Sequence, residues 1–269
     1  MEKLQTAIEK ARVQRQGNAR PKAAPAVEAP ASEVVDRWTA LKPAKIPEHA
    51  LRRNLLVSQA GGRDAGPFDM LRTRIQQQAR ANGWKRIAMV SPYSGSGKTT
   101  LTANLLFSFG RQSELRTMVL DLDLRRPSLA RILEQNCSHT MADVLQGRVA
   151  FADHGLRYGH NVALGLNRGS VEASAEILQT QKTREALDML EADYEPDFVL
   201  FDMPPMHTAD DNIGFLNNVD CAVLLAEAER TTIKEIDVAE RQVAELTNVM
   251  GIVLNKSRYA DSAYGYGYY

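Results

Sequence analysis

The stretch MVSPYSGSGKTT, at residues 89–100, constrains the fold of this 269-residue chain more than any other part of it. An apolar segment runs into a Gly/Ser loop, and a helical pattern begins at Lys98-Thr99. In a phosphate-binding loop, backbone N–H groups and the positive end of the following helix surround phosphate oxygens. Gly95 and Gly97 fit such a loop because a Cβ atom would keep the backbone away from the phosphates. The stretch therefore predicts a P-loop between a strand and a helix.

The general P-loop pattern, G-x-x-x-x-G-K-[ST], has Gly at the place that Pro92 occupies here. Strand, loop, Lys-Thr and helix nevertheless follow one another in the required order, which favours a nucleotide site over an accidental turn. Lys98 is expected to reach the β- and γ-phosphates, and Thr99 to supply a hydroxyl to Mg²⁺. The expected phosphate-binding residues are Ser94, Gly95, Ser96, Gly97, Lys98, Thr99 and Thr100.

Apolar segments of strand length alternate with amphipathic helical segments from residue 66 onward. Such alternation is typical of βαβ units, which build a parallel sheet with helices on both faces. The sequence therefore predicts an α/β fold with a doubly wound, mainly parallel sheet of the P-loop NTPase class. Strands are expected at 85–91, 117–123, 197–202, 221–228 and 250–255, and helices at 68–82, 98–112, 210–218 and 231–247, with helical patterns also leading up to about residue 193.

Carboxylates follow two of the predicted strands. TMVLDLDLRRP carries Asp121 and Asp123, and DFVLFDMPP carries Asp202 after four apolar residues. Ligands of an open α/β sheet lie beyond the carboxyl ends of its strands, so these side chains are expected to share one crevice with the P-loop. Carboxylates packed together repel one another unless a cation lies between them, which indicates Mg²⁺. The expected catalytic residues are Lys98, Asp121, Asp123 and Asp202, and the expected metal ligands are Thr99, Asp121 and Asp202.

Composition excludes several classes of protein. The 33 basic and 33 acidic residues give a net charge of zero, so no global field favours nucleic acid. Cys137 and Cys221 lie far apart in unlike contexts, as expected in a reducing compartment. The longest apolar runs are of strand length, well short of the roughly 20 residues that a membrane span needs. We therefore expect a cytoplasmic protein, unless a partner recruits it to a membrane.

Both ends of the chain differ from this central part. Residues 1–18 predict a short helix with Leu4, Ile8 and Ala11 on one face, which either remains solvated or docks to a partner. Residues 19–65 form an Ala/Pro-rich linker and lead-in segment, and 66–257 the P-loop domain. Residues 258–269 predict a flexible tail, because Gly, Ala, Ser and Asp separate its aromatic residues. This tail holds five of the chain's eight tyrosines: Tyr259, Tyr264, Tyr266, Tyr268 and Tyr269.

Together, the P-loop, VLDLDLR, FVLFDMPP and the tyrosine-rich end resemble the bacterial tyrosine autokinases of capsule and exopolysaccharide export. TMADVLQG at 140–147 and the position of Asp210 extend this resemblance over residues 66–269. The resemblance implies an ATP- and Mg²⁺-dependent enzyme that phosphorylates its own tail tyrosines and so regulates polysaccharide polymerisation and export through an assembly–disassembly cycle. It also implies that Arg125 and Asn255 contact the nucleotide, Asn255 at the adenine.

This sequence departs from the family in its oligomerisation motif, E-x-x-R-x-x-R. In GPFDMLR, Gly66 replaces Glu, Asp69 replaces the first Arg, and only Arg72 remains. A homo-oligomer is still expected, with different contacts from the usual ring. The chain further resembles the split form of the family, in which a separate membrane polysaccharide co-polymerase activates the kinase and recruits it to the inner face of the membrane.

Other functions fit parts of the same pattern. A switch ATPase of the partition and division-site type would have Lys where Tyr93 stands, and a scaffold of the export machinery would carry the tail without phosphorylating it. The catalytic base is also open between Asp121 and Asp123, of which Asp123 is preferred.

Overall fold

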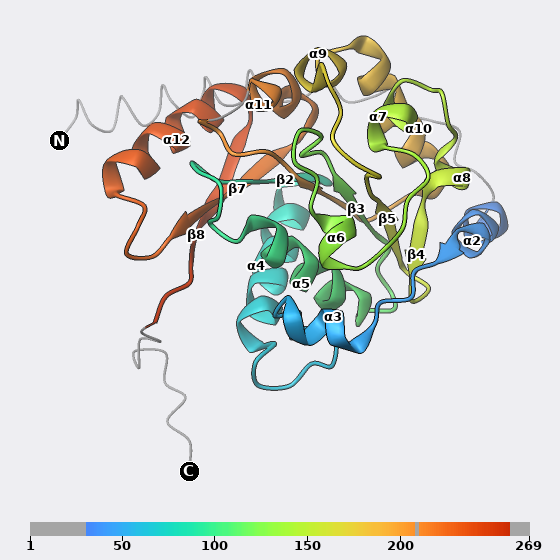
Figure 1. The fold of residues 1–269 in the computed structure, drawn as a ribbon, viewed down its shortest axis with the longest axis horizontal. Coiled ribbons are helices and arrows are strands. Elements are labelled where there is room, and N and C mark those ends of the chain that lie inside the picture. The colour runs from blue at the N-terminus through green and yellow to red at the C-terminus, as the bar shows by residue number, and fades with distance from the viewer. Residues whose placement is uncertain (1–30, 208–209, 259–269) are drawn as a thin grey trace.

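The computed structural model describes residues 31–207 and 210–258, and its centre is an eight-stranded sheet (Figure 1). The strand order is β1-β4-β5-β3-β6-β2-β7-β8, and every neighbouring pair is parallel except β4 and β5. This confirms the predicted α/β class with a mainly parallel sheet. The strands are β1 (Lys42–Pro43), β2 (Arg86–Val90), β3 (Thr117–Asp121), β4 (Leu156–Tyr158), β5 (Val162–Gly165), β6 (Phe198–Asp202), β7 (Cys221–Glu227) and β8 (Asn248–Asn255).

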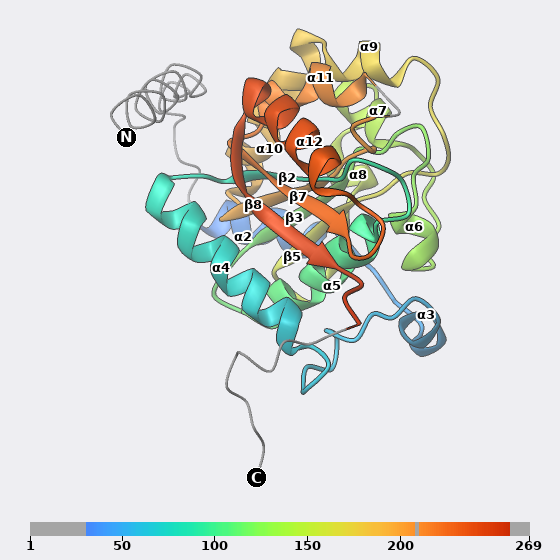
Figure 2. The ribbon, with the colours of Figure 1, turned by 90° about the vertical axis from the view of Figure 1, so that its left-hand side faces the viewer.

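Helices cover both faces of the sheet, and each face has its own apolar core. Figure 2 shows α4 and α5 on one face and α10, α11 and α12 on the other. The central strands β2, β3 and β6 are buried throughout, which explains why they appear in the sequence as continuous apolar runs. The helices are α2 (Ala31–Ala40), α3 (Glu48–Arg53), α4 (Gly66–Asn82), α5 (Lys98–Gly110), α6 (Leu129–Ile132), α7 (Met141–Leu145), α8 (Phe151–His154), α9 (Ser174–Leu178), α10 (Gln181–Tyr194), α11 (Asp211–Phe215), the 3₁₀ helix η1 (Leu216–Asn218) and α12 (Ile233–Leu246).

The lead-in segment packs against this body, in contrast to the predicted domain boundary at residue 66. Val34, Trp38 and Leu41 are buried in the core, and the Trp38 indole N–H donates to the Tyr194 carbonyl at 2.7 Å. Strand β1 also joins the edge of the sheet beside β4. Within the described residues the folded unit therefore begins at Ala31. The surrounding Ala and Pro residues concealed this because they give the whole segment the composition of a linker.

The stretch before residue 193 is also less helical than predicted, because it contains β4 and β5. These strands have three and four residues, which is too few for a clear periodic pattern. They form an antiparallel hairpin, with Gly159 at φ 61° between them. Pairing with β3 and β1, which only the folded sheet provides, decides their conformation.

Candidate nucleotide-binding site

The loop between β2 and α5 forms one wall of a cavity of about 550 Å³ at the carboxyl ends of the central strands. All predicted phosphate-binding residues, from Ser94 to Thr100, line it. Gly95 and Gly97 have φ values of 86° and 85°, a conformation that side chains with a Cβ rarely adopt. A Cβ atom on Gly97 would also lie 2.4 Å from Asn255 Nδ2. Glycine is thus required at this position both by backbone conformation and by space.

Residues at the end of β8 and directly after it support the backbone of the loop. Asn255 Nδ2 donates to the Ser96 carbonyl at 2.7 Å, and Lys256 Nζ donates to the Gly95 carbonyl at 2.7 Å. Lys256 also pairs with Glu227 at 2.9 Å, and this hydrogen bond lowers the pKa of the Glu227 carboxyl. The Asn255 bond joins its amide to the loop backbone, and the contact of this amide with an adenine ring stays a prediction. Neither hydrogen bond to the loop was predicted, since they join residues about 160 positions apart.

Asp202 lies at the end of β6 and is fully buried. Lys98 Nζ is 3.4 Å from Asp202 Oδ1, and neither carboxylate oxygen of Asp202 accepts a hydrogen bond within the described structure. A buried carboxylate without hydrogen-bond donors is costly unless a cation approaches it. Its environment therefore suits the coordination shell of a divalent cation, as the sequence predicted for Asp202.

Asp121, in contrast, is occupied by backbone donors. Its Oδ2 accepts from the N–H groups of Ser128 and Leu129 at 3.2 and 3.1 Å, and so holds the start of α6. Burial, together with the nearby Asp202 carboxylate, raises the pKa of Asp121 well above its usual range. Ser128 in turn donates to the Thr99 hydroxyl at 3.1 Å. Asp121 thereby positions the residues around the Thr99 hydroxyl.

Asp123 lines the cavity and is 9% exposed. Burial raises the pKa of its carboxyl, although Lys98 and a hydrogen bond from the Arg126 N–H act in the opposite direction. A carboxylate that faces a cavity and has a raised pKa is better matched to accepting a proton near neutral pH. Of the two aspartates considered as the base, the structure therefore favours Asp123.

Basic residues surround the rest of the cavity. Arg125 lines it, and its guanidinium is paired with Asp210 at 2.8 Å and with Asp211 at 2.7 Å. Arg125 was expected at the nucleotide, whereas two further arginines and a lysine in the lining were not. Arg126, which directly follows Arg125 in the RRP segment, could have been found from the sequence. The missed basic residues are Arg126, Arg131 and Lys256.

The donor set fits a nucleotide with a divalent cation. Loop amides and cationic side chains line the space where phosphates would lie, and Thr99 and the Asp202 oxygens, which accept no hydrogen bond within the described residues, can serve the cation. In the part of the chain that the structure describes, no three His, Cys, Asp or Glu side chains are grouped to hold a metal alone. Phosphate oxygens and water would therefore complete the coordination, as is usual for Mg²⁺.

The remaining oligomerisation-motif residues make contacts within the chain. On α4, Asp69 bonds with Arg111 and Ser108, and Arg72 donates to the Ser108 carbonyl at 2.9 Å. Burial lowers the pKa of Arg72, and the Asp69 carboxylate opposes this. These residues tie α4 to α5.

Several predicted features fall outside the described residues, namely the helix at 1–18 and the five tail tyrosines. Between residues 31 and 207, and between 210 and 258, no helix combines the length and apolarity needed to cross a membrane.

Known proteins resemble this chain over the same region. The model of the CobQ/CobB/MinD/ParA nucleotide-binding domain (CbiA) matches residues 87–264. The tyrosine-protein kinase YwqD of Bacillus subtilis is 25% identical over 224 residues, covering 81% of this chain and 92% of YwqD. The tyrosine-protein kinase Etk of Escherichia coli is 26% identical over 174 residues, but these are only 24% of Etk. The resemblance to bacterial tyrosine kinases is thereby confirmed.

Solved structures agree with the fold. The kinase domain of Escherichia coli Etk superposes with a TM-score of 0.68 at 24% identity, covering 80% of this chain and 84% of that domain. MinD of Pyrococcus horikoshii, solved with Mg-ADP, gives a TM-score of 0.55 at 23% identity, covering 66% and 72%. At these identities the superpositions establish the shared architecture. Because the domain model spans about two thirds of the sequence, the chain belongs to the CobQ/CobB/MinD/ParA family of nucleotide-binding domains.

Proposed function

We propose that the chain is an ATP- and Mg²⁺-dependent protein-tyrosine kinase that phosphorylates its own C-terminal tyrosines. The observation that carries this proposal is the position of Lys256, which lines the nucleotide cavity only three residues before Tyr259. In the sequence, the tyrosine-rich segment therefore follows within three residues of the cavity lining. The kinase names of the relatives support the same activity.

Different residues of the cavity have different roles in the proposed phosphoryl transfer. Lys98 and the loop amides would hold the β- and γ-phosphates, and Thr99 and Asp202 would hold Mg²⁺, which would supply positive charge against the phosphates. Asp123 accepts the proton of the tyrosine hydroxyl, whose ordinary pKa near 10 makes it a poor nucleophile at neutral pH. The phenolic oxygen then forms its bond to the γ-phosphorus as the bond to ADP breaks. Asp121 positions Ser128, and thereby the Thr99 hydroxyl.

The acceptors are Tyr259, Tyr264, Tyr266, Tyr268 and Tyr269. The 13 residues that follow Lys256 can span roughly 45 Å when extended, at about 3.4 Å per residue. This length allows the tail to enter the cavity of a neighbouring subunit. Its Gly and Ser residues allow the backbone to bend into such a site.

Phosphorylation would also control assembly. Each phosphotyrosine adds about −1.5 to −2 charges, so five of them add roughly −8 to −10 to one tail. Crowded tails would then repel one another, and a homo-oligomer would dissociate. We assign to this cycle the regulation of exopolysaccharide or capsule export, with a membrane polysaccharide co-polymerase that anchors and activates the kinase at the inner face of the membrane. Because Asp69 and Arg72 are engaged within the chain, the oligomer would use other contacts.

Phosphotyrosine mapping of the purified protein tests the proposal. After incubation with Mg²⁺ and ATP, mass spectrometry should find phosphate on the tail tyrosines of the wild type and none on Lys98→Met. Labelling of Lys98→Met purified from a host without tyrosine kinases would disprove autophosphorylation.

A switch ATPase is the second candidate, because the fold is shared with MinD. Tyr93 argues against it. It stands where that class has its signature lysine, and its hydroxyl bonds Glu235 at 3.0 Å, which raises the pKa of the tyrosine. ATP-dependent dimerisation without phosphotyrosine would favour the switch ATPase.

A further inference from the structure

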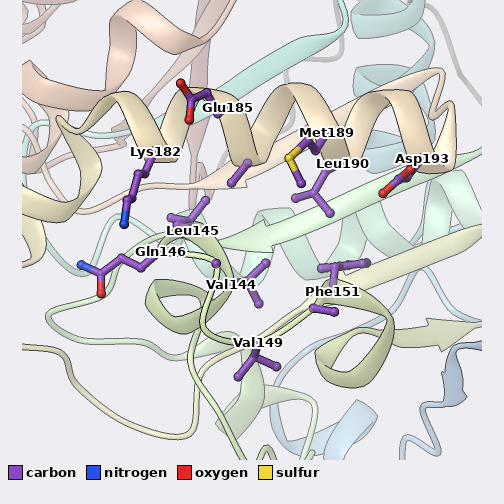
Figure 3. A pocket seen from close by; sticks show the side chains of 13 residues that line it. Val144, Leu145, Gln146, Val149, Phe151, Lys182, Glu185, Met189, Leu190 and Asp193 are labelled. Atoms are coloured by element: carbon purple, nitrogen blue, oxygen red, sulfur yellow. The ribbon is translucent and has the colours of Figure 1, made fainter. Parts of the chain in front are cut away.

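A second hollow, of about 450 Å³, lies between α7 and α10 and shares no lining residue with the nucleotide cavity. Figure 3 shows α10 along one side, with Val144, Val149 and Phe151 on the other. Lys182 lies near one end and Asp193 at the opposite end. We call this hollow the α7–α10 groove.

The lining of the groove is mainly apolar, and part of it remains exposed. Val144, Phe151 and Leu190 form its buried floor, whereas Met189 is 63% exposed at its rim. A thioether side chain in this position is adaptable and suits an irregular apolar partner. Grooves of this kind commonly receive the apolar face of an amphipathic helix.

Helix α2 brings the N-terminal part of the chain to the Asp193 end of the groove. The Arg37 guanidinium donates to Asp193 Oδ1 at 2.5 Å and to the Asp193 carbonyl at 3.0 Å. Beside it, Trp38 bonds the Tyr194 carbonyl. Since α2 has ten residues, its first residue, Ala31, lies within about 15 Å of these contacts. The chain that precedes Ala31 therefore starts close to the groove.

The preceding segment has the length and pattern to fill it. The 14 residues 17–30 include three prolines and reach about 43 Å at roughly 3.1 Å per residue. A helix over 2–16 would be about 22 Å long, and the stretch of α10 from Lys182 to Asp193 is about 16 Å. Leu4 and Ile8 fall on one face of that helix.

We propose that the α7–α10 groove is the docking site of residues 2–16 of the same chain, with Leu4 and Ile8 against its apolar floor. The apolar stripe of this helix is too thin for strong binding between separate molecules. A tether of 14 residues, however, places the helix at an effective concentration in the millimolar range beside the groove. The chain itself is therefore the occupant that the structure favours. This inference does not depend on the kinase proposal.

Hydrogen exchange of the full-length protein, followed by mass spectrometry, tests the docking. The double variant Leu4→Asp/Ile8→Asp should make the amides of 144–151 and 182–193 exchange several-fold faster than in the wild type. The matched control, Thr6→Asp/Val13→Asp, adds the same charge to the opposite face and should exchange like the wild type. The amides of α5 should exchange equally slowly in all of these proteins, which shows that the rest of the domain remains folded.

A groove-side variant provides the second measurement. Met189→Glu should make the amides of 144–151 and 182–193 exchange faster than in the wild type. Arg184→Glu, on the same helix but outside the groove, should leave their exchange unchanged. Equal exchange in the wild type and in Leu4→Asp/Ile8→Asp would overturn the proposal. The groove would then be a docking site for another protein. Protection that disappears on tenfold dilution would also overturn it, because the occupant would then be a second copy.

Discussion

The nucleotide cavity and the α7–α10 groove have similar volumes but opposite chemistry. The cavity lies at the ends of β2, β3 and β6, and its lining includes Lys98, Asp123 and four further basic residues. The groove lies between the sides of two helices, and Val144, Phe151 and Leu190 form its floor. Strand ends bring polar backbone and charged side chains together, whereas helix sides bring together the apolar stripes that also build the core. Substitutions in the cavity should therefore change the rate of phosphoryl transfer or the binding of nucleotide. Substitutions in the groove should change the free energy of unfolding or the docking of residues 2–16.

Lys98→Met should give the largest effect, a complete loss of tail phosphotyrosine, because in the proposed mechanism Lys98 is the cation of the P-loop that holds the phosphates. The free energy of unfolding should change far less. Lys85→Met, an exposed lysine beside the opposite end of β2, is the control and should retain activity. Equal loss in both variants would show that the assay reports folding and not chemistry.

Asp123→Asn should reduce the phosphorylation rate by about 100-fold or more, since it removes the proton acceptor. Burial raises the pKa of Asp123, so the wild-type rate should rise with pH through that raised value, and the variant should lack this rise. Because burial favours the protonated Asp123 carboxyl in the folded state, this group adds to the free energy of unfolding at low pH. That contribution is lost as the pH rises through the pKa of Asp123 in the folded protein. The variant should thus be at least as stable as the wild type at neutral pH. A normal rate with Asp123→Asn would exclude the residue as the base.

Leu190→Ala should lower the free energy of unfolding by about 3 kcal/mol, because this side chain is 6% exposed and its loss leaves a cavity. Met189→Ala, one residue away but 63% exposed, should change it by less than about 0.5 kcal/mol. Denaturant unfolding measures both. Equal losses would mean that the rim of the groove is packed as firmly as its floor.

Lys256→Met should weaken ATP binding about tenfold, as expected for one charged hydrogen bond to the Gly95 carbonyl. The rate at saturating ATP should change less, because the hydrogen bond of Lys256 supports the loop backbone at Gly95. Calorimetric titration with a non-hydrolysable ATP analogue measures the affinity, and Lys234→Met on the exposed side of α12 serves as the control. Unchanged affinity would show that the loop keeps its shape without this brace.

Much of the cavity could be predicted because its residues follow one another along the chain. The P-loop from Ser94 to Thr100 is continuous. Asp121 and Asp202 end the buried strands β3 and β6, and Asp123 lies two residues after β3. The contacts of Asn255 and Lys256 with this loop could not be predicted in the same way. They depend on β8 reaching the loop after the sheet has formed.

The sequence by itself determined the strands β2, β3, β6, β7 and β8, the phosphate loop and the acidic strand ends, since each is a local pattern with a local physical cause. Only the tertiary structure decided that residues 31–65 join the core and that β4 and β5 are strands, because distant partners supply their contacts. It also decided which carboxylate remains available for chemistry. Asp121 accepts backbone hydrogen bonds and Asp202 accepts none, and this difference arises from where α6 begins beside the sheet.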